Sequence, residues 1–339
     1  MFLYLNHIDD REHRNHIENS MCLCGSKKIF IMKKIKIAVP ATVANLVCGF
    51  DILGMALNDP SDIMELELID EPIINIKHTD DYDLPEAAEQ NVAGVALQAL
   101  IEDYGKPIGF NLTVHKNIKP GSGLGSSAAG SAGAVAAANH LLNNYFSKED
   151  LVRFAMNGEK LATGVKHADN VAPCIYGGIT LVRSVFPLDI ISLAAPDLFV
   201  TVVHPQIEVK TADARQILRK EVQLKDAIKQ WGNIAGLVAG ILKNDIPLIG
   251  RSLEDVIIEP IRSILIPGFG VVKQMSKEAG ALGGGISGSG PSIFMLSENE
   301  TIAKQVEKVM ADVYSAMCID FKTYVTTINP QGVKIIHSE

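Results

Sequence analysis

The sequence predicts an α+β fold, in which strands and helices follow one another without a regular βαβ alternation. Three observations lead to this prediction. Several short segments alternate apolar and polar residues with the period of two that is typical of half-buried strands. Other segments repeat apolar residues at helical spacing, and two glycine-rich loops interrupt the chain. We find no internal repeat in the sequence.

The first half of the chain combines both kinds of segment. Apolar and polar residues alternate in several of them, and in residues 62–69 the apolar Met64, Leu66 and Leu68 share one side. Strands are expected at residues 35–39, 62–69, 109–115 and 179–185. Helices are expected at residues 91–101, at residues 128–142, and from a cap at Ser147 to about Thr163. Ser147 and Asp150 have the spacing of an N-cap residue and its N3 partner.

The second half begins near Asp197. Strands are expected at residues 198–203, 293–296 and 323–327, a glycine-rich loop at 283–292, and a helix at 301–314. We therefore divide the chain into a first domain of residues 32–195 and a second of residues 196–339. Residues 1–31 are rich in His, Asn and charged residues without core periodicity, so a disordered extension is expected there.

Composition excludes several classes of protein. The 339 residues carry a net charge of −8 and no basic stripe, which argues against a nucleic-acid partner. Five scattered cysteines do not form a disulfide framework, and the Cys22-Leu-Cys24 pair has no companion at metal-site spacing. No apolar run reaches the length of about 18 residues that a membrane span needs. A cytoplasmic protein is expected.

The segment from Pro120 to Ala128 has the properties of a phosphate-binding loop. It consists of Pro120, Gly121, Ser122, Gly123, Leu124, Gly125, Ser126, Ser127 and Ala128. Its glycines permit positive φ and a close approach of the backbone to an anion. The free N–H groups of the following helix, together with its dipole, favour negative charge at the same place. The loop lacks the lysine of the Walker A pattern, so a flexible Gly/Ser loop is the alternative.

Three segments carry a resemblance to a known family. Residues 121–129, Gly-Ser-Gly-Leu-Gly-Ser-Ser-Ala-Ala, resemble the nucleotide loop of the GHMP kinases, which phosphorylate small molecules with ATP. Residues 40–51 resemble the N-terminal substrate motif of that family, and residues 284–292 resemble its C-terminal glycine motif. The resemblance covers about residues 33–337. It implies an N-terminal domain with a left-handed βαβ crossover, a ferredoxin-like C-terminal domain, and a nucleotide in the cleft between them.

Within this family, the remaining segments are most similar to homoserine kinases. The similarity lies in His-x-Asp-Asn-Val-Ala-Pro at residues 167–173 and in the Thr-x-x-x-Arg spacing at residues 211–215. It implies that ATP phosphorylates L-homoserine to O-phospho-L-homoserine, a step toward threonine. The residues that would contact homoserine are Asn45, Asp51, His167, Asn170, Thr211, Arg215, Arg262 and Gly288.

The charges of this set suit an amino acid. Arg215 and Arg262 can bind a carboxylate bidentately, and the Asp51 carboxylate matches an ammonium group. Asn170 would contact the reacting hydroxyl, whereas Asp169 is expected to act on local structure rather than as a general base. One position departs from the family pattern, since Val47 stands where glycine or serine is frequent.

The resemblance also assigns the phosphate end of the site. It implies that Ser127 and Glu159 bind Mg²⁺, and that these two residues and Asn170 form the catalytic set. Lys116 is assigned to the γ-phosphate and Asn91 to the adenine end. Two other functions stay open: a GHMP kinase for mevalonate or a sugar, and an inactive GHMP protein that regulates a partner. A homodimer also stays open.

Overall fold

The computed structural model describes residues 32–209 and 211–339, and the side chains of Thr211 and Ala212 are not among the described atoms. The expected extension at residues 1–31, which includes Cys22 and Cys24, lies outside the described residues. Met32–Glu339 forms one compact unit.

The first sheet has seven strands and is mostly antiparallel. Its order is β11-β1-β2-β4-β3, and β5 pairs with both β2 and β6. The strands are β1 (Lys34–Ala44), β2 (Leu53–Ile69), β3 (Ile74–His78), β4 (Gly109–His115), β5 (Ile179–Val185), β6 (Leu188–Leu193) and β11 (Lys334–Ser338). Only β3 and β4 are a parallel pair among the described strands, and the chain between them forms α1, so β3-α1-β4 is a βαβ crossover.

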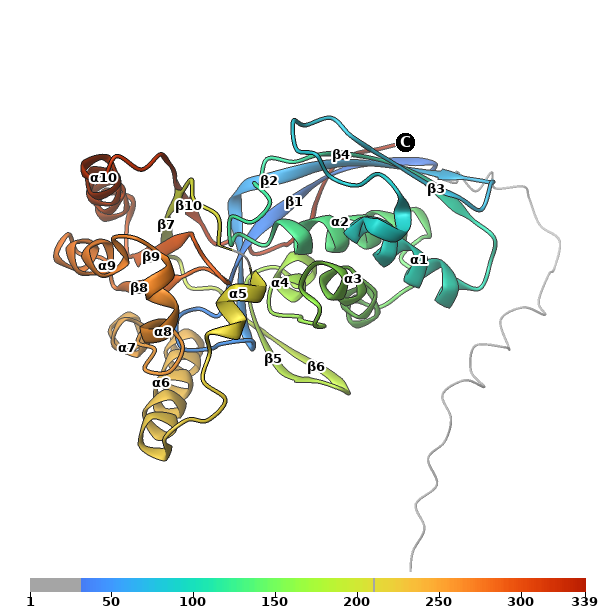
Figure 1. Ribbon diagram of the computed structural model, residues 1–339. Helices are drawn as coiled ribbons and strands as arrows, with labels where there is room; N and C mark the ends of the chain where they lie inside the picture. Colours follow the sequence, from blue (N-terminus) through green and yellow to red (C-terminus); the bar gives the residue numbers. More distant parts are fainter. Residues whose placement is uncertain (1–31, 210) are drawn as a thin grey trace, which may run out of the picture. The chain divides into compact units, whose positions relative to one another are not determined.

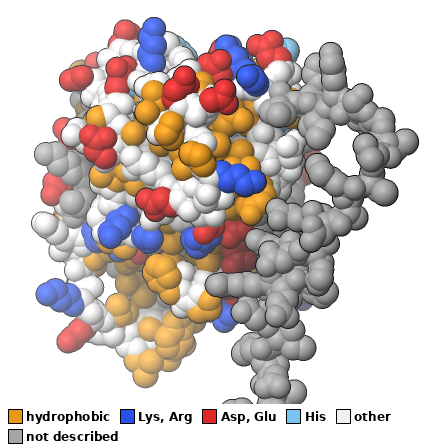
Figure 2. Space-filling model, turned by 90° about the vertical axis from the view of Figure 1, so that its right-hand side faces the viewer, with side chains coloured by type: hydrophobic (Ala, Val, Ile, Leu, Met, Phe, Trp, Pro, Cys, Tyr) orange, Lys and Arg blue, Asp and Glu red, His pale blue; other side chains and the backbone are white. Residues whose placement is uncertain are grey.

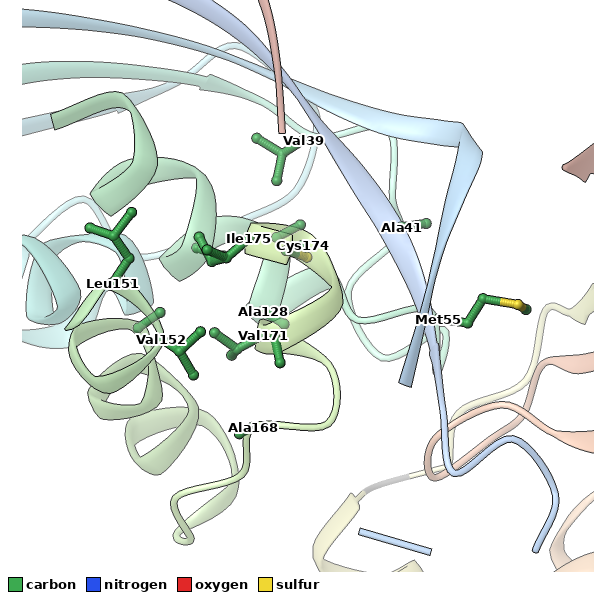
Figure 3. Close-up of a cluster of buried hydrophobic side chains, with 14 of the residues drawn as sticks. Val39, Ala41, Met55, Ala128, Leu151, Val152, Ala168, Val171, Cys174 and Ile175 are labelled. Atoms are coloured by element: carbon green, nitrogen blue, oxygen red, sulfur yellow. The ribbon is translucent and has the colours of Figure 1, made fainter. Parts of the chain in front are cut away.

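Four helices cover one face of this sheet (Figure 1). They are α1 (Val92–Tyr104), preceded by the short η2 (Ala88–Gln90), α2 (Ser126–Leu141), α3 (Lys148–Thr163) and α4 (Val171–Tyr176). Figure 3 shows the apolar layer between sheet and helices, with Val39 and Ala41 from β1 and Val152 from α3. At Gly133 of α2, a Cβ atom would lie 2.5 Å from Val39 Cγ2, so glycine allows α2 to approach the sheet closely.

The second sheet has four antiparallel strands in the order β10-β7-β9-β8. They are β7 (Phe199–Pro205), β8 (Gly283–Ile286), β9 (Ile293–Ser297) and β10 (Phe321–Thr327). The accompanying helices are α5 (Thr211–Gln216), α6 (Leu224–Lys243), α7 (Ile246–Ser252), α8 (Glu259–Arg262), η3 (Ser263–Leu265), α9 (Phe269–Glu278) and α10 (Glu300–Ala316). In chain order the strands are arranged 4-1-3-2, which is the split βαβ of ferredoxin-like folds.

Alternate residues of β7 face different apolar clusters. Val203 packs with α9 and α10, whereas Val200 and Val202 belong to the larger cluster that continues under the first sheet. The second sheet is therefore buried on both faces, which explains why valines on both sides of β7 are buried.

The predicted elements occur near their expected positions, but several differ in extent. Strands β1 and β2 are longer than the predicted segments 35–39 and 62–69, and α2 begins at Ser126, inside the predicted loop. Residues 283–286 form β8 and not part of a loop, because glycine lets the strand approach its neighbour: a Cβ atom on Gly284 would lie 2.0 Å from the Phe294 carbonyl oxygen. Strands β3, β6 and β11 were not predicted. Since β11 pairs with β1, the chain returns to the first sheet at its end. The domain boundary between residues 195 and 196 stays a prediction.

Two properties of the surface bear on partners. On the face shown in Figure 2, acidic and basic side chains are interspersed between apolar ones. Within residues 32–209 and 211–339, no helix has both the length and the apolar character needed to cross a membrane.

Candidate active site

A cavity of about 390 Å³ lies among the segments that the sequence singled out. Its walls come from the start of α1, the glycine loop before α2, the end of α3, the segment around His167, and the second glycine loop. Most of the predicted site residues line this cavity, namely Asn45, Asp51, Asn91, Lys116, Pro120, Gly121, Gly123, Gly125, Ser126, Ser127, Glu159, His167, Asn170, Arg215, Arg262 and Gly288.

The first glycine loop has the backbone of an anion cradle. Gly121, Gly123 and Gly125 have φ values of +75°, +79° and +69°, which are unfavourable for residues with a Cβ atom. The helix α2 begins directly afterwards at Ser126, so the N–H groups of its first turn have no partner within the helix. These donors and the helix dipole face the cavity, where they can bind phosphate oxygens.

The second glycine loop holds the first one in place. Ser287 Oγ donates to the Gly123 carbonyl at 2.7 Å, and the Ser292 N–H donates to the Ser122 carbonyl at 3.3 Å. A Cβ atom on Gly123 would lie 2.6 Å from the Gly290 and Ser287 carbonyl oxygens, so only glycine permits this contact. Contact between the two loops joins the two sheets at the cavity.

Glu159 places a buried carboxylate at the phosphate end. The side chain is 3% exposed, and its Oε1 atom has no hydrogen-bond partner among the described residues. Burial raises the pKa of Glu159 to about 7, although a hydrogen bond from Ser127 and the Lys116 charge oppose the shift. An unpartnered carboxylate oxygen beside a serine hydroxyl fits Mg²⁺, which takes one or two protein oxygens and otherwise binds water and phosphate. In the described part of the chain, no group of three or more His, Cys, Asp or Glu is arranged so that it could hold a metal ion.

Lys116 differs from the expectation. The residue is 7% exposed, and its ammonium group forms an ion pair with Asp62 and donates to the Ser126 carbonyl at 2.8 Å. Asp62 in turn accepts the N–H groups of Asn117 and Ile118. Two of the three N–H donors of Lys116 are thus used by Asp62 and Ser126, and these contacts stabilise the start of α2. The assignment of Lys116 to the γ-phosphate stays a prediction.

The charged residues at the opposite end are paired with one another. Arg215 Nη2 donates to both carboxylate oxygens of Asp51 at 2.9 Å, and it lies 3.4 Å from His167 Nε2. Because arginine can only donate, Nε2 is the acceptor and the imidazole proton belongs on Nδ1, 3.8 Å from Asp51 Oδ1. Burial, assisted by the Arg215 and Arg262 charges, lowers the pKa of His167 despite the Asp51 carboxylate.

Arg262 is a buried cation that forms no ion pair with a carboxylate of the described residues. Its side chain donates to the carbonyl oxygens of Ala214 at 3.0 Å and Gly288 at 3.1 Å, and it lies over the Phe50 ring. No carboxylate oxygen of the described residues forms an ion pair with it, and burial lowers its pKa. A buried guanidinium that faces a cavity with only carbonyl partners is suited to an anionic ligand.

The turn that carries Asp51 has a strained backbone and is held by hydrogen bonds of the Asn45 side chain. Asn45, Leu46 and Val47 have consecutive φ values of +73°, +40° and +66°. Asn45 Nδ2 donates to the Gly288 carbonyl at 2.8 Å, and its Oδ1 accepts the Asp51 N–H at 3.1 Å. A positive φ is unusual for a β-branched residue, which explains why glycine would suit position 47. The Asn45 amide therefore shapes the turn, and its contact with substrate stays a prediction.

Asn170 and Asp169 lie between the two ends of the cavity. Asn170 Oδ1 accepts a hydrogen bond from the Thr42 hydroxyl at 2.8 Å. Asp169 is 4% exposed, and burial, with smaller effects of the Asp51 and Glu159 carboxylates, raises its pKa to about 7. Sequence reasoning did not identify Thr42, because nothing in its local pattern indicates a partner 128 residues away.

The part of the cavity beside the start of α1 has an apolar wall. Leu84, Pro85 and Val92 contribute to this wall, which sequence reasoning did not identify. Asn91 caps α1 by accepting the Ala93 N–H at 2.9 Å and donates to the Pro85 carbonyl at 2.6 Å. Its position at the adenine end stays a prediction, and its present contacts order the loop.

Three of the predicted residues whose side chains the structure describes do not line the cavity. Leu124 and Ala128 are buried in the core, and the Ser122 hydroxyl accepts the Leu124 N–H at 3.3 Å. These three side chains stabilise the loop from within. The backbone of Thr211 begins α5, but its side chain lies outside the described atoms. Ser126 lines the cavity, but its hydroxyl donates to the Ile118 carbonyl at 2.8 Å.

Comparison with known proteins agrees with this arrangement. Residues 91–178 match the family model of the GHMP kinase N-terminal domain, and residues 237–316 match that of the GHMP kinase C-terminal region. The homoserine kinase of Chloroherpeton thalassium is 41% identical over 319 residues, which cover 90% of this chain and 100% of the relative. That of Methanococcus maripaludis is 40% identical over 301 residues, covering 88% of this chain and 97% of the relative.

A solved structure extends the comparison to three dimensions. The crystal structure of a homoserine kinase from Cytophaga hutchinsonii is 48% identical in sequence, with a TM-score of 0.86. The match covers 93% of this chain and 100% of that chain. The family models, the relatives and the solved structure all indicate the same family. The chain belongs to the homoserine kinases of the GHMP kinase family.

Proposed function

We propose that the protein transfers the γ-phosphoryl group of ATP to the hydroxyl of L-homoserine, with Mg²⁺ at Ser127 and Glu159. One observation supports this most directly. A phosphate-binding loop shares a single cavity with the Asp51 carboxylate and with the buried Arg262, which forms no ion pair with a carboxylate of the described residues. A zwitterionic alcohol has the two charges that this end of the cavity would bind, with a hydroxyl that can extend toward the loop.

Binding would exchange one set of ion pairs for another. In this structure Arg215 Nη2 lies 2.9 Å from Asp51 Oδ1, so the two charges neutralise each other. The ammonium group of homoserine would form an ion pair with Asp51, and its carboxylate would bind Arg215 and Arg262. Each charge would therefore keep a partner. A ligand with a carboxylate but no amine would leave Asp51 without its arginine, which is costly in a partly buried site.

Catalysis would depend on positioning and charge stabilisation. The metal, when bound, neutralises charge on the transferring phosphoryl group. The protein residues would supply the loop N–H groups for the phosphates, the Ser127 and Glu159 oxygens for the ion, and Asn170 for the acceptor hydroxyl. A new bond forms between the homoserine oxygen and the γ-phosphorus, while the bond from that phosphorus to the β,γ-bridging oxygen breaks. With no side chain assigned as general base, the hydroxyl proton would pass to an oxygen of the transferring γ-phosphoryl group. Asp169 would serve to hold Asn170 in place.

A substrate panel tests the proposal. ADP release is measured with the full chain, ATP and Mg²⁺ in the presence of homoserine, mevalonate, galactose, shikimate, or the deaminated analogue 4-hydroxybutyrate. We expect turnover with homoserine and at least a hundredfold lower kcat/KM with 4-hydroxybutyrate. Preference for mevalonate or galactose would support another GHMP kinase. No turnover with any of the substrates would support a regulatory protein without activity.

Two further expectations accompany this proposal. A cytoplasmic location and a homodimer stay predictions, and neither affects the assignment of the cavity.

A further inference from the structure

Thr42 connects the two halves of the reaction site without lining the cavity. It lies in β1, and its side chain is fully buried at 0% exposure. Two of its hydrogen bonds reach the site. Its backbone N–H donates to the Leu124 carbonyl of the phosphate loop at 3.1 Å. Its hydroxyl donates to Asn170 Oδ1 at 2.8 Å. One residue therefore contacts both the loop that would hold ATP and the amide that would hold the acceptor.

The phosphate loop packs directly against this contact. A Cβ atom on Gly125 would lie 2.0 Å from Thr42 Oγ1 and 3.0 Å from Asn170 Oδ1. Only a glycine at that position leaves room for the hydroxyl and the amide beneath the first turn of α2. The spacing between loop and amide is thus determined by contacts among Thr42, Gly125 and Asn170.

The hydroxyl also determines which group of the amide faces the cavity. Because the Thr42 hydroxyl donates its proton to Oδ1, the Asn170 carbonyl oxygen is occupied and Nδ2 is the group left to meet a ligand. An amide N–H can donate to the oxygen of an alcohol. In that arrangement the alcohol proton points away from Asn170, consistent with transfer without a base at this residue.

We infer that Thr42 is a positioning residue, which fixes the Asn170 amide in its donor orientation and sets its distance from the phosphate loop. This inference rests on the proposed function, because it assumes that Asn170 holds the acceptor hydroxyl. Thr42 acts through Asn170 and the loop, and it contacts neither substrate.

Four variants test the inference. Thr42→Val keeps the shape of the side chain and removes the donor, whereas Thr42→Ser keeps the donor and removes a methyl group. Thr180→Val is the matched control, since Thr180 is equally buried and its hydroxyl has no partner among the described residues. Asn170→Ala provides the second arm of a double-mutant cycle. ADP release is measured for each, with thermal unfolding to confirm the folded state.

We expect Thr42→Val to lower kcat about 10- to 100-fold, with KM for ATP and for homoserine changed by less than about threefold. Thr42→Ser should restore kcat to within about threefold of the unchanged protein, and Thr180→Val should leave it unchanged. In an Asn170→Ala background, Thr42→Val should have almost no further effect, because contacting residues are not additive.

Several results would overturn the inference. Full kcat in a folded Thr42→Val protein would show that the hydroxyl has no role, and additive losses in the double variant would show that Thr42 does not act through Asn170. If Thr42→Val does not fold, Thr42→Ser decides: a large loss of kcat in a folded Thr42→Ser protein contradicts a role for the hydroxyl. Absence of homoserine turnover in the unchanged protein would refute the proposed function, a result distinct from these.

Discussion

Replacing Glu159 by glutamine should stabilise the protein and at the same time impair its activity. The carboxylate is buried, and its pKa is raised from 4.5 to about 7, so the ionised form is disfavoured in the folded state. Each pKa unit corresponds to about 1.4 kcal/mol, which gives a destabilisation of about 3 kcal/mol when Glu159 is fully ionised. Glutamine has nearly the same shape and carries no charge.

The sign of the pH dependence follows from the raised pKa. Folding favours the protonated acid, so the stability that protonation provides is present below about pH 4.5 and is lost as the pH rises through about 7. Glu159→Gln should therefore gain up to about 3 kcal/mol over the unchanged protein at pH 8 and almost nothing at pH 4.5. Mg²⁺ should stabilise only the protein that keeps the carboxylate.

Two measurements on the same variant check this reasoning. Urea unfolding is followed at pH 4.5 and 8, with EDTA or with Mg²⁺, and kcat is measured across Mg²⁺ concentrations. We expect a loss of kcat on the order of 10²-fold, or about 2.7 kcal/mol, for a lost transition-state interaction. Glu149→Gln, an exposed position in the first turn of the same helix, is the control.

One pair of results would refute the argument. If Glu159→Gln is no more stable than the unchanged protein at pH 8 in EDTA, burial does not disfavour the charge. If its activity also keeps the same dependence on Mg²⁺, Glu159 does not bind the ion. Stabilisation without loss of kcat would retain the electrostatic argument and reject the metal role.

Three further substitutions probe the remainder of the site. Arg215→Leu removes charged hydrogen bonds worth about 3 kcal/mol, so it should raise KM for homoserine by about 10²-fold and leave KM for ATP unchanged. An unchanged KM for homoserine would place Arg215 outside the pocket. Gly125→Ala should raise KM for ATP and lower the melting temperature more than Gly121→Ala. A Cβ atom on Gly125 would lie 2.0 Å from Thr42 Oγ1, whereas one on Gly121 would meet nothing within 4 Å. Equal effects of the two variants would exclude the predicted collision. Asp169→Asn should retain kcat within about tenfold, and it should remove the loss of stability that ionisation of Asp169 causes as the pH rises through about 7. A folded variant without turnover would indicate a general base.

What the sequence determined by itself is local. The alternation of apolar and polar residues located β4 and β5 at their observed bounds, and the capping box of Ser147 and Asp150 begins α3 as expected. The glycine spacing of the phosphate loop matches three positive φ values. These features depend on residues a few positions apart, whose steric and hydrogen-bonding preferences act before any long-range contact forms.

What only the tertiary structure decided is how distant groups pair. Arg215 and Asp51 are 164 residues apart, and the sequence assigned each to a substrate charge without indicating that they neutralise each other. Thr42 meets Asn170 across 128 residues, and Lys116 is engaged by Asp62 from a neighbouring strand. Residue types can be matched to a ligand from sequence, whereas pKa shifts, unpartnered atoms and amide orientation depend on burial and on neighbours that only the packed chain supplies.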